Sequence, residues 1–213
     1  MKNILIIAGP SAVGKTTLAT ALLKIDPRFE FVRSVTTRAP RGDSFDNEYI
    51  YISKDEFLNL IDTQGVLEHT EYAGNLYGTP RSEIDRISAQ GGVPLLVLDI
   101  NGVASLSKNK GDISPCSVYV YDDIEVMEER LRLRYGGDCD KMASRVQQNR
   151  RDFGMMCQHV NNFYAFSKNS ETVEEGAAKL YEIFRSFENG IPKNEEENLS
   201  VAASLGCSIA DKK

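Results

Sequence analysis

Residues 9–16 constrain the fold of this chain more than any other stretch. They read Gly-Pro-Ser-Ala-Val-Gly-Lys-Thr and match G-x-x-x-x-G-K-[ST], the pattern of a phosphate-binding loop. An apolar, β-branched run precedes the loop at residues 3–8, as is typical of a buried parallel strand. A run of helix formers follows at residues 17–24. This order of strand, loop and helix predicts an α/β fold with a phosphate-binding loop. The alternative interpretation of residues 9–16 is a glycine turn with an incidental lysine.

The chemistry of phosphate binding explains the residue types in this loop. Glycines let the backbone bend closely around oxygen atoms, and successive N–H groups then point at a phosphate beside a helix N-terminus. A lysine at position 15 would reach the β- and γ-phosphates, and the hydroxyl of Thr16 would sit on Mg²⁺. We therefore predict that the phosphates of a nucleoside triphosphate bind to Gly9, Pro10, Ser11, Ala12, Val13, Gly14, Lys15, Thr16 and Thr17.

Composition narrows the class of protein. The 213 residues suffice for one α/β domain with inserted lobes, and the net charge of −6 argues against a general nucleic-acid binder. We expect no signal peptide and no membrane span, because the first strand begins at once and no long apolar run occurs. The four cysteines are scattered without a C-x-x-C pair, which predicts free thiols in a reducing cytoplasm rather than a disulfide framework or a zinc site.

Arginines gather in two stretches, residues 28–41 and 130–151. In an acidic protein such clusters indicate binding sites for small anions. The simpler alternative is that both clusters lie on solvent-exposed faces and bind nothing. Near the first stretch lie residues suited to a dianionic phosphate, which calls for charged and neutral donors: Ser34, Arg38, Arg41, Tyr49 and Tyr77.

Two further polar residues suggest how a nucleobase could be recognised. Glu68 is expected on a half-buried strand near Thr79, and a carboxylate can accept two hydrogen bonds at once. Guanine offers such an edge, N1–H beside its amino group, and adenine does not. Asp99 follows the apolar strand 94–98, where an acid either lies near a metal or caps a turn.

The pattern of apolar and turn residues predicts the remaining elements. Strands are expected at 29–35, 48–52, 66–72, 76–77, 94–99 and 116–121, and helices at 53–62, 80–90, 123–135, from 139 past 151, and 171–187. Gly136-Gly137 would be a flexible break between the two arginine-bearing helices. Residues 188–213 read as a polar, acidic tail without a core of its own, partly disordered, in which one short helix could form.

The chain resembles the guanylate kinase family over residues 3 to about 187. The resemblance is carried by GPSAVGKTTL, SVTTRAPRGD, EYIYIS, LEHTEYAGNLYGTP, LLVLDINGV and the arginine-bearing segment 130–151. It implies a P-loop NTPase fold with a three-layer core and parallel sheet, an inserted GMP-binding lobe and a mobile helical lid. The implied bounds are 1–33, 80–130 and 152–187 for the core, about 34–79 for the lobe and about 131–151 for the lid.

The resemblance also implies the reaction and the roles of residues. The family transfers the γ-phosphoryl group of ATP to GMP or dGMP, with Mg²⁺. The phosphate of GMP would bind Arg38, Arg41, Tyr49 and Tyr77, and the base would bind Ser34, Glu68, Thr79 and Asn101. Lys15, Arg134 and Arg145 would be catalytic, Asn169 would lie near adenine, and Asp99 would bind Mg²⁺ through water with Thr16. We expect a monomer or homodimer that acts in the cytoplasm on these small molecules, without nucleic-acid or membrane partners.

The chemistry needs no general base, because the attacking phosphate of GMP is already an oxyanion, and we expect His69 and His159 to be structural.

Three departures from the family pattern stand out. Ala12 replaces a usual glycine, for which we expect little effect; the turn 41–48 is about a residue shorter; and Asn101 replaces a usual aspartate. The alternatives are a sugar-bisphosphate or other nucleotide kinase on the same frame, and a catalytically inactive domain that binds phosphopeptides. Glu68 argues against the sugar phosphate, and Lys15 with Arg134 and Arg145 argues against the inactive domain.

Overall fold

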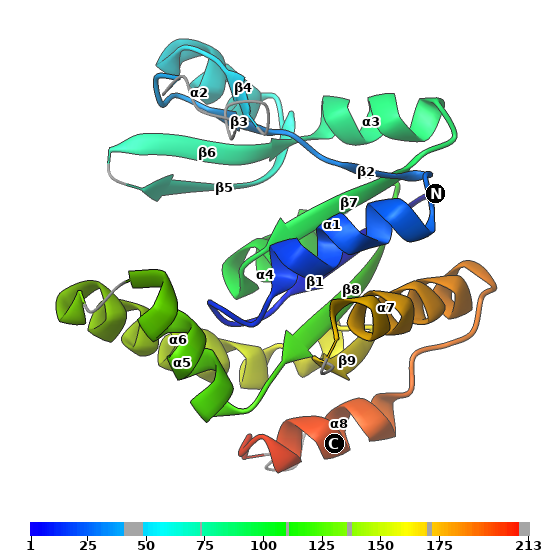
Figure 1. Cartoon of the computed structure of the whole chain (residues 1–213). Helices are drawn as coiled ribbons and strands as arrows, with labels where there is room; N and C mark the ends of the chain where they lie inside the picture. Colours follow the sequence, from blue (N-terminus) through cyan, green and yellow to red (C-terminus); the bar gives the residue numbers. More distant parts are fainter. Residues whose placement is uncertain (41–48, 73, 110, 136–137, 170–171, 209–213) are drawn as a thin grey trace.

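The computed structural model describes residues 1–40, 49–72, 74–109, 111–135, 138–169 and 172–208; Figure 1 draws the others in grey. The predictions for Arg41, for the turn 41–48 and for the break at Gly136-Gly137 therefore lie outside the described residues. Within those ranges, no helix combines the length and the apolar character needed to cross a bilayer.

A five-stranded parallel sheet forms the centre of the molecule. Its order is β2-β7-β1-β8-β9, and every neighbouring pair runs parallel. The strands are β1 (Lys2–Ala8), β2 (Phe29–Phe31), β7 (Val93–Leu98), β8 (Ile113–Tyr121) and β9 (Ala165–Lys168). The predicted α/β class is confirmed.

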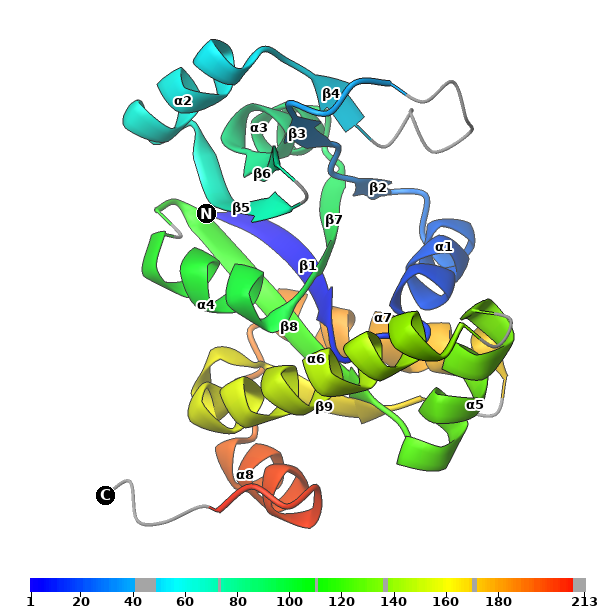
Figure 2. The same ribbon diagram turned by 90° about the vertical axis from the view of Figure 1, so that its left-hand side faces the viewer.

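Helices cover both faces of this sheet, which gives three layers (Figures 1 and 2). Side chains alternate along β1, so Leu5 and Ile7 pack under α1 (Lys15–Ile25) and α7 (Val173–Glu188). Ile4 and Ile6 belong to the opposite cluster, which includes side chains of α4 (Ile100–Asn109) and of α6 (Cys139–Gln158). Because both faces are covered, the central strands are mostly apolar, as is typical of a buried parallel sheet.

A second sheet of four strands stands beyond the β2 edge of the first (Figures 1 and 2). Its order is β4-β3-β6-β5, from β3 (Ser34–Thr36), β4 (Tyr49–Tyr51), β5 (Val66–Tyr72) and β6 (Asn75–Pro80). Helix α2 (Lys54–Asp62) covers it and buries Phe57. The capping box predicted at the start of α2 is present, with Ser53 and Glu56 exchanging hydrogen bonds.

The single strand expected at residues 29–35 is wrong, because β2 and β3 belong to different sheets. The chain leaves the parallel sheet after Val32, whose N–H donates to Leu95 O at 3.0 Å. The side chain of Arg33 then makes two hydrogen bonds to Glu83, at 2.9 and 3.0 Å, at the start of α3 (Arg81–Ala89). This ion pair joins the two chain segments that cross between the sheets, and alternation of residue types could not reveal it.

The helices that carry the second arginine cluster, α5 (Ile124–Tyr135) and α6, pack against one another on the side of the molecule away from the second sheet (Figures 1 and 2). A short 3-10 turn, η2 (Val160–Asn162), leads from α6 into β9. The sequence analysis missed β9, which has only four residues, and α4, although Ile100, Val103 and Ala104 of α4 are buried at helical spacing.

The expectation that residues 188–213 lack a core is also wrong for most of the segment. Asn194 caps a helix, α8 (Glu195–Ser204), that lies beyond the β9 edge, and Ala202 is fully buried in the cluster below the sheet. The buried amide of Asn198 donates to the carbonyls of Phe163 and Tyr164, both at 3.2 Å. Polar contacts to distant residues thus hold this segment, and a search for apolar periodicity does not detect them.

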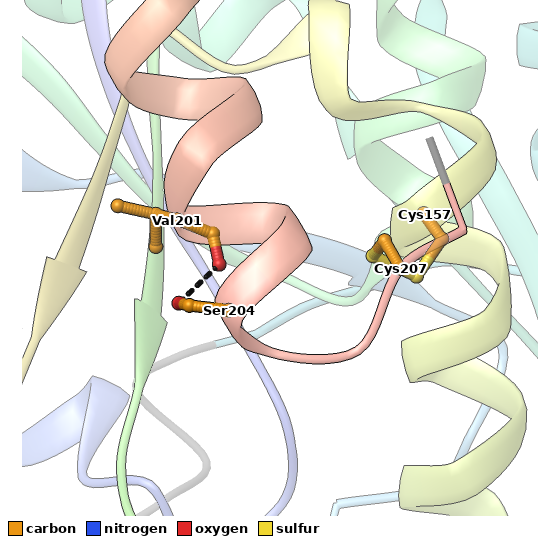
Figure 3. The surroundings of a disulfide bond; sticks show 4 residues. All are labelled: Cys157, Val201, Ser204 and Cys207. Carbon is orange, nitrogen blue, oxygen red and sulfur yellow. Dashed lines mark hydrogen bonds between the residues drawn. A yellow bond between two sulfur atoms is a disulfide. The ribbon is translucent and has the colours of Figure 1, made fainter. Parts of the chain in front are cut away.

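The prediction of four free thiols is contradicted as well. Cys207, just after α8, forms a disulfide with Cys157 near the end of α6 (Figure 3). The two residues are 50 positions apart in the sequence, and no spacing motif links them. Cys116 is free and buried under α1 and α7.

Candidate active site

The phosphate loop connects β1 to α1 and has the backbone that its glycines permit. Gly9 and Gly14 have φ values of +150° and +98°, and a Cβ at Gly9 would lie 2.2 Å from Val120 O. Ala12 also has a left-handed φ, +67°. This conformation is about 1–2 kcal/mol less favourable for an L-residue than for glycine. Position 12 is therefore conformationally restricted, although the sequence pattern leaves it free.

Lys15 begins α1 and folds back over the loop. Its Nζ donates to the carbonyls of Gly9 and Pro10, each at 2.8 Å. Burial lowers the pKa of Lys15 to about 8, against the opposing influence of the carboxylates of Asp152 and Asp99. An anionic phosphate in this place would restore the charged form of the amine, because an opposite charge favours it.

A cavity of about 390 Å³ opens over the loop and the start of α1. Seven of the predicted ATP-binding residues line it: Ser11, Ala12, Gly14, Lys15, Thr16, Thr17 and Asn169. Arg130 and Arg134 of α5 line the same cavity. Arg145 instead donates from its Nε to the hydroxyl of Tyr135 at 3.2 Å. The structure thus brings one of the two predicted catalytic arginines to the loop.

Three residues around the loop were missed as site residues. Arg130 forms an ion pair with Asp122 at 2.9 Å and reaches Ala12 O at 3.4 Å. Asn149 and Asp152 project from α6; the first bonds to Ser11, and the second lies close enough to influence Lys15. Burial raises the pKa of Asp152, and the carboxylate of Asp99 adds to this effect. Of these three residues, only Arg130 could have been selected from the sequence, because the segment 130–151 stands out by its arginines.

Glu68 and Thr79, two residues of the predicted base site, meet across β5 and β6. The Thr79 hydroxyl donates to Glu68 Oε1 at 2.6 Å, and Thr79 is 2% exposed. Burial raises the pKa of Glu68, although the hydrogen bond from Thr79 opposes the shift. One oxygen of the carboxylate is therefore held in place, while the group can still accept from a ligand.

Three of the predicted phosphate residues lie together: Arg38 in the bend after β3, Tyr49 on β4 and Tyr77 on β6. Arg38 places its guanidinium 5.2 Å from the ring centre of Tyr49, and the Tyr49 and Tyr77 rings are 6.1 Å apart. Ser34 pairs with Tyr49 in the register of β3 and β4. Tyr51, which the sequence analysis did not select, accepts a hydrogen bond from Arg38 at 3.1 Å. A cationic group among tyrosine hydroxyls fits a phosphate.

Asp99 and Asn101 lie where β7 passes into α4. Asp99 Oδ1 accepts from Gly102 N at 2.8 Å and so caps α4, the structural role considered as an alternative. The carboxylate of Asp99 also acts on Lys15 and on Glu68 electrostatically, so it lies between the phosphate loop and β5. Asn101 is exposed in the first turn of α4, which packs beside β5.

Known proteins of one family resemble this chain. A family model described as guanylate kinase matches residues 1–187. A guanylate kinase of Synechocystis sp. is 36% identical over 148 residues, covering 68% of this chain and 76% of the relative. One from Lactobacillus johnsonii is 31% identical over 196 residues, with 89% and 91% covered. The crystal structure of guanylate kinase from Anaplasma phagocytophilum is 25% identical, with a TM-score of 0.58 over 87% of this chain and 86% of that chain.

Proposed function

Because the chain belongs to the guanylate kinase family, we propose that its two clusters of polar residues are the donor and acceptor sites of one reaction. Phosphorylation of GMP by ATP is the function of this family, and the protein is an ATP:GMP phosphotransferase of purine nucleotide metabolism. The assignment of its residues rests on the carboxylate of Glu68, which is half-buried and bound by Thr79 across β5 and β6.

The acceptor base binds to Glu68 in this proposal. An ionised carboxylate accepts from both N1–H and the amino group of guanine, whereas adenine has no matching pair of donors. The hydrogen bond from Thr79 fixes the orientation of the carboxylate before the ligand arrives. Ser34 and Asn101 complete the base site, and Asn101 contributes a neutral oxygen where the usual aspartate has a charge.

The acceptor phosphate binds between Arg38, Tyr49 and Tyr77. Arg38 is already stacked against Tyr49, so little conformational freedom is lost when the phosphate binds. Arg41 is proposed as a second charged donor. The 5′-phosphate of dGMP has the same charge and shape, so both GMP and dGMP are substrates.

Positioning and charge neutralisation perform the catalysis. An oxygen of the GMP phosphate attacks the γ-phosphorus of ATP, the bond to the β,γ-bridging oxygen breaks, and ADP leaves with that electron pair. Lys15 and Arg134 stabilise the charge on the transferring group from the loop and from α5. Arg145 joins them when residues 131–151 close as a lid, which also excludes water. Asn169 and the loop residues bind the rest of ATP.

The donor site also fits Mg²⁺, which the family generally uses. Thr16 presents its hydroxyl in the donor cavity, and Asp99 is near enough to Lys15 to influence it. Both offer the oxygen ligands that Mg²⁺ prefers, and the phosphates of ATP and water would supply the others. When bound, the ion supplies positive charge to the β- and γ-phosphate oxygens.

In this proposal the enzyme acts in the cytoplasm, as a monomer or homodimer, on nucleotides rather than on nucleic acid or membranes. Its domain bounds are a core of 1–33, 80–130 and 152–187, an acceptor lobe of about 34–79 and a lid of about 131–151. Size-exclusion chromatography with light scattering would separate the two oligomeric states, and a larger assembly would contradict both.

An assay of ADP release tests the proposal. With ATP and Mg²⁺ the acceptors would be GMP, dGMP, AMP and ribose 1,5-bisphosphate, and we expect turnover with the two guanine nucleotides. Glu68→Gln should reduce the preference for GMP over AMP by about 10- to 100-fold, since it removes one charge-assisted acceptor. Glu71→Gln, on the exposed face of the same strand, is the matched control.

The separation of the two sites is tested with Lys15→Ala. Turnover should be abolished while GMP binding, measured by calorimetry, stays within about threefold. Lys24→Ala, at the exposed end of the same helix, should retain both. Loss of GMP binding in Lys15→Ala would contradict the separation, and release of ADP with the sugar but not with GMP would overturn the acceptor assignment.

A further inference from the structure

Every carbonyl from Gly9 to Val13 accepts a hydrogen bond from a side chain. Lys15 serves the first two of these carbonyls, as described above. The other three are bound from outside the loop. Asn149 Nδ2 donates to Ser11 O at 3.2 Å, Arg130 Nη1 reaches Ala12 O at 3.4 Å, and Asn169 Nδ2 donates to Val13 O at 2.9 Å. With the carbonyls engaged in this way, the peptide N–H groups of the loop are oriented together.

Asn149 differs from the other two because it binds both main-chain groups of one residue. Its Oδ1 also accepts from Ser11 N at 2.7 Å. A single amide thus fixes both the position and the orientation of Ser11, next to the left-handed residue Ala12. Bonding at two points restricts rotation of the peptide groups more than any one hydrogen bond would.

The place of Asn149 on α6 gives this contact a consequence for the reaction. Asn149 lies four residues after Arg145, one helical turn or about 6 Å along the same face. We propose that Asn149 is a positioning residue that fastens α6 to the phosphate loop and so sets the approach of Arg145 to the donor phosphates. This role rests on the proposed donor site and adds a residue that the sequence pattern of the loop does not contain.

Two substitutions of Asn149 test the proposal through the kinetics for ATP. Asn149→Leu keeps the branched shape of the side chain and favours the helix but removes both hydrogen bonds, and Asn149→Ala removes the side chain beyond Cβ. Both should lower kcat/KM for ATP by about 10- to 30-fold, the effect of two hydrogen bonds, and leave KM for GMP within about twofold. Gln147→Ala, exposed on the same helix, should behave as wild type.

A double-mutant cycle with Arg145→Ala tests the link between the lid arginine and the loop. In that background Asn149→Leu should lower kcat/KM for ATP by about threefold or less, because the group to be positioned is absent. Full additivity would overturn the link. Values of kcat/KM for ATP within about twofold of wild type in both Asn149 variants would overturn the positioning role. A rise of KM for GMP as large as the fall in kcat/KM for ATP would also overturn the positioning role, since it would indicate a general structural defect. An inactive wild-type enzyme would instead refute the proposed function itself.

Discussion

The Cys157–Cys207 disulfide should make the stability of this enzyme depend on the redox state of the solution. It closes a loop between positions 50 residues apart and ties the segment after α8 to α6. In the chain-entropy model, a loop of this length stabilises the folded state by about 4 kcal/mol, through the restriction of the unfolded chain. That is a large share of the roughly 5–15 kcal/mol by which domains are stable.

Reduction of the disulfide should remove this contribution. For a chain of 213 residues, a loss of about 4 kcal/mol corresponds to a fall in the melting temperature of about 8–16 °C. The measurement is thermal unfolding with and without reductant, followed by circular dichroism. The double variant Cys157→Ser/Cys207→Ser is the control and should match the reduced wild type under both conditions. Burial raises the pKa of Cys116 far above its usual range, so its thiol is unreactive in the folded protein.

Thiol counting determines whether the bond is present. The chain has four cysteines, so the denatured oxidised protein should react with two equivalents of an alkylating reagent and the reduced protein with four. Four reactive thiols without reductant would refute the disulfide. Two thiols together with an unchanged melting temperature would refute the energetic argument, and would mean that the disulfide adds nothing to global stability.

Four further predictions concern single residues. Asn101→Asp should leave kcat/KM for GMP within about tenfold, and a thousandfold change would contradict the place given to Asn101 in the base site. Burial raises the pKa of Glu68 above the ordinary 4.5, so this carboxylate becomes protonated at a higher pH than an ordinary glutamate. As the pH falls, KM for GMP should therefore begin to rise already above pH 4.5, and Glu68→Gln should remove this dependence. The pKa of Lys15, about 8 in the free enzyme, predicts that kcat/KM for ATP falls as the pH rises through this value, and a flat profile would contradict it. Arg33 and Arg86 hold the pKa of Glu83 at about 2, so its ion pairs stabilise the fold above pH 4.5 and lose this effect as the pH falls toward 2. Glu83→Gln should therefore lower the free energy of unfolding in urea by about 1–2 kcal/mol at pH 7, after allowance for the partly exposed arginines, and by less at pH 3.

The donor half of the site was predictable because its chemistry is local in the sequence. A strand, a glycine loop and a helix follow one another within residues 2–25, and each glycine has a backbone requirement of its own. The prediction of the acceptor half depended on residue types whose chemistry is specific, above all Glu68 and Thr79, and the structure adds that these two side chains are in contact. Arg134 was likewise placed at the loop, whereas Arg145 points to Tyr135 in this structure.

The sequence by itself determined the α/β class, the phosphate loop and most of the residues proposed here to bind the two nucleotides, because these features lie in short stretches with fixed periodicity and chemistry. Only the tertiary structure decided that residues 29–36 divide between two sheets, that α8 packs on the core, and that Cys157 bonds to Cys207. It also placed Asn149 and Arg130 on the carbonyls of the loop. These contacts join residues about 35 to 140 positions apart, so their stability comes from packing and hydrogen bonds that no local pattern encodes.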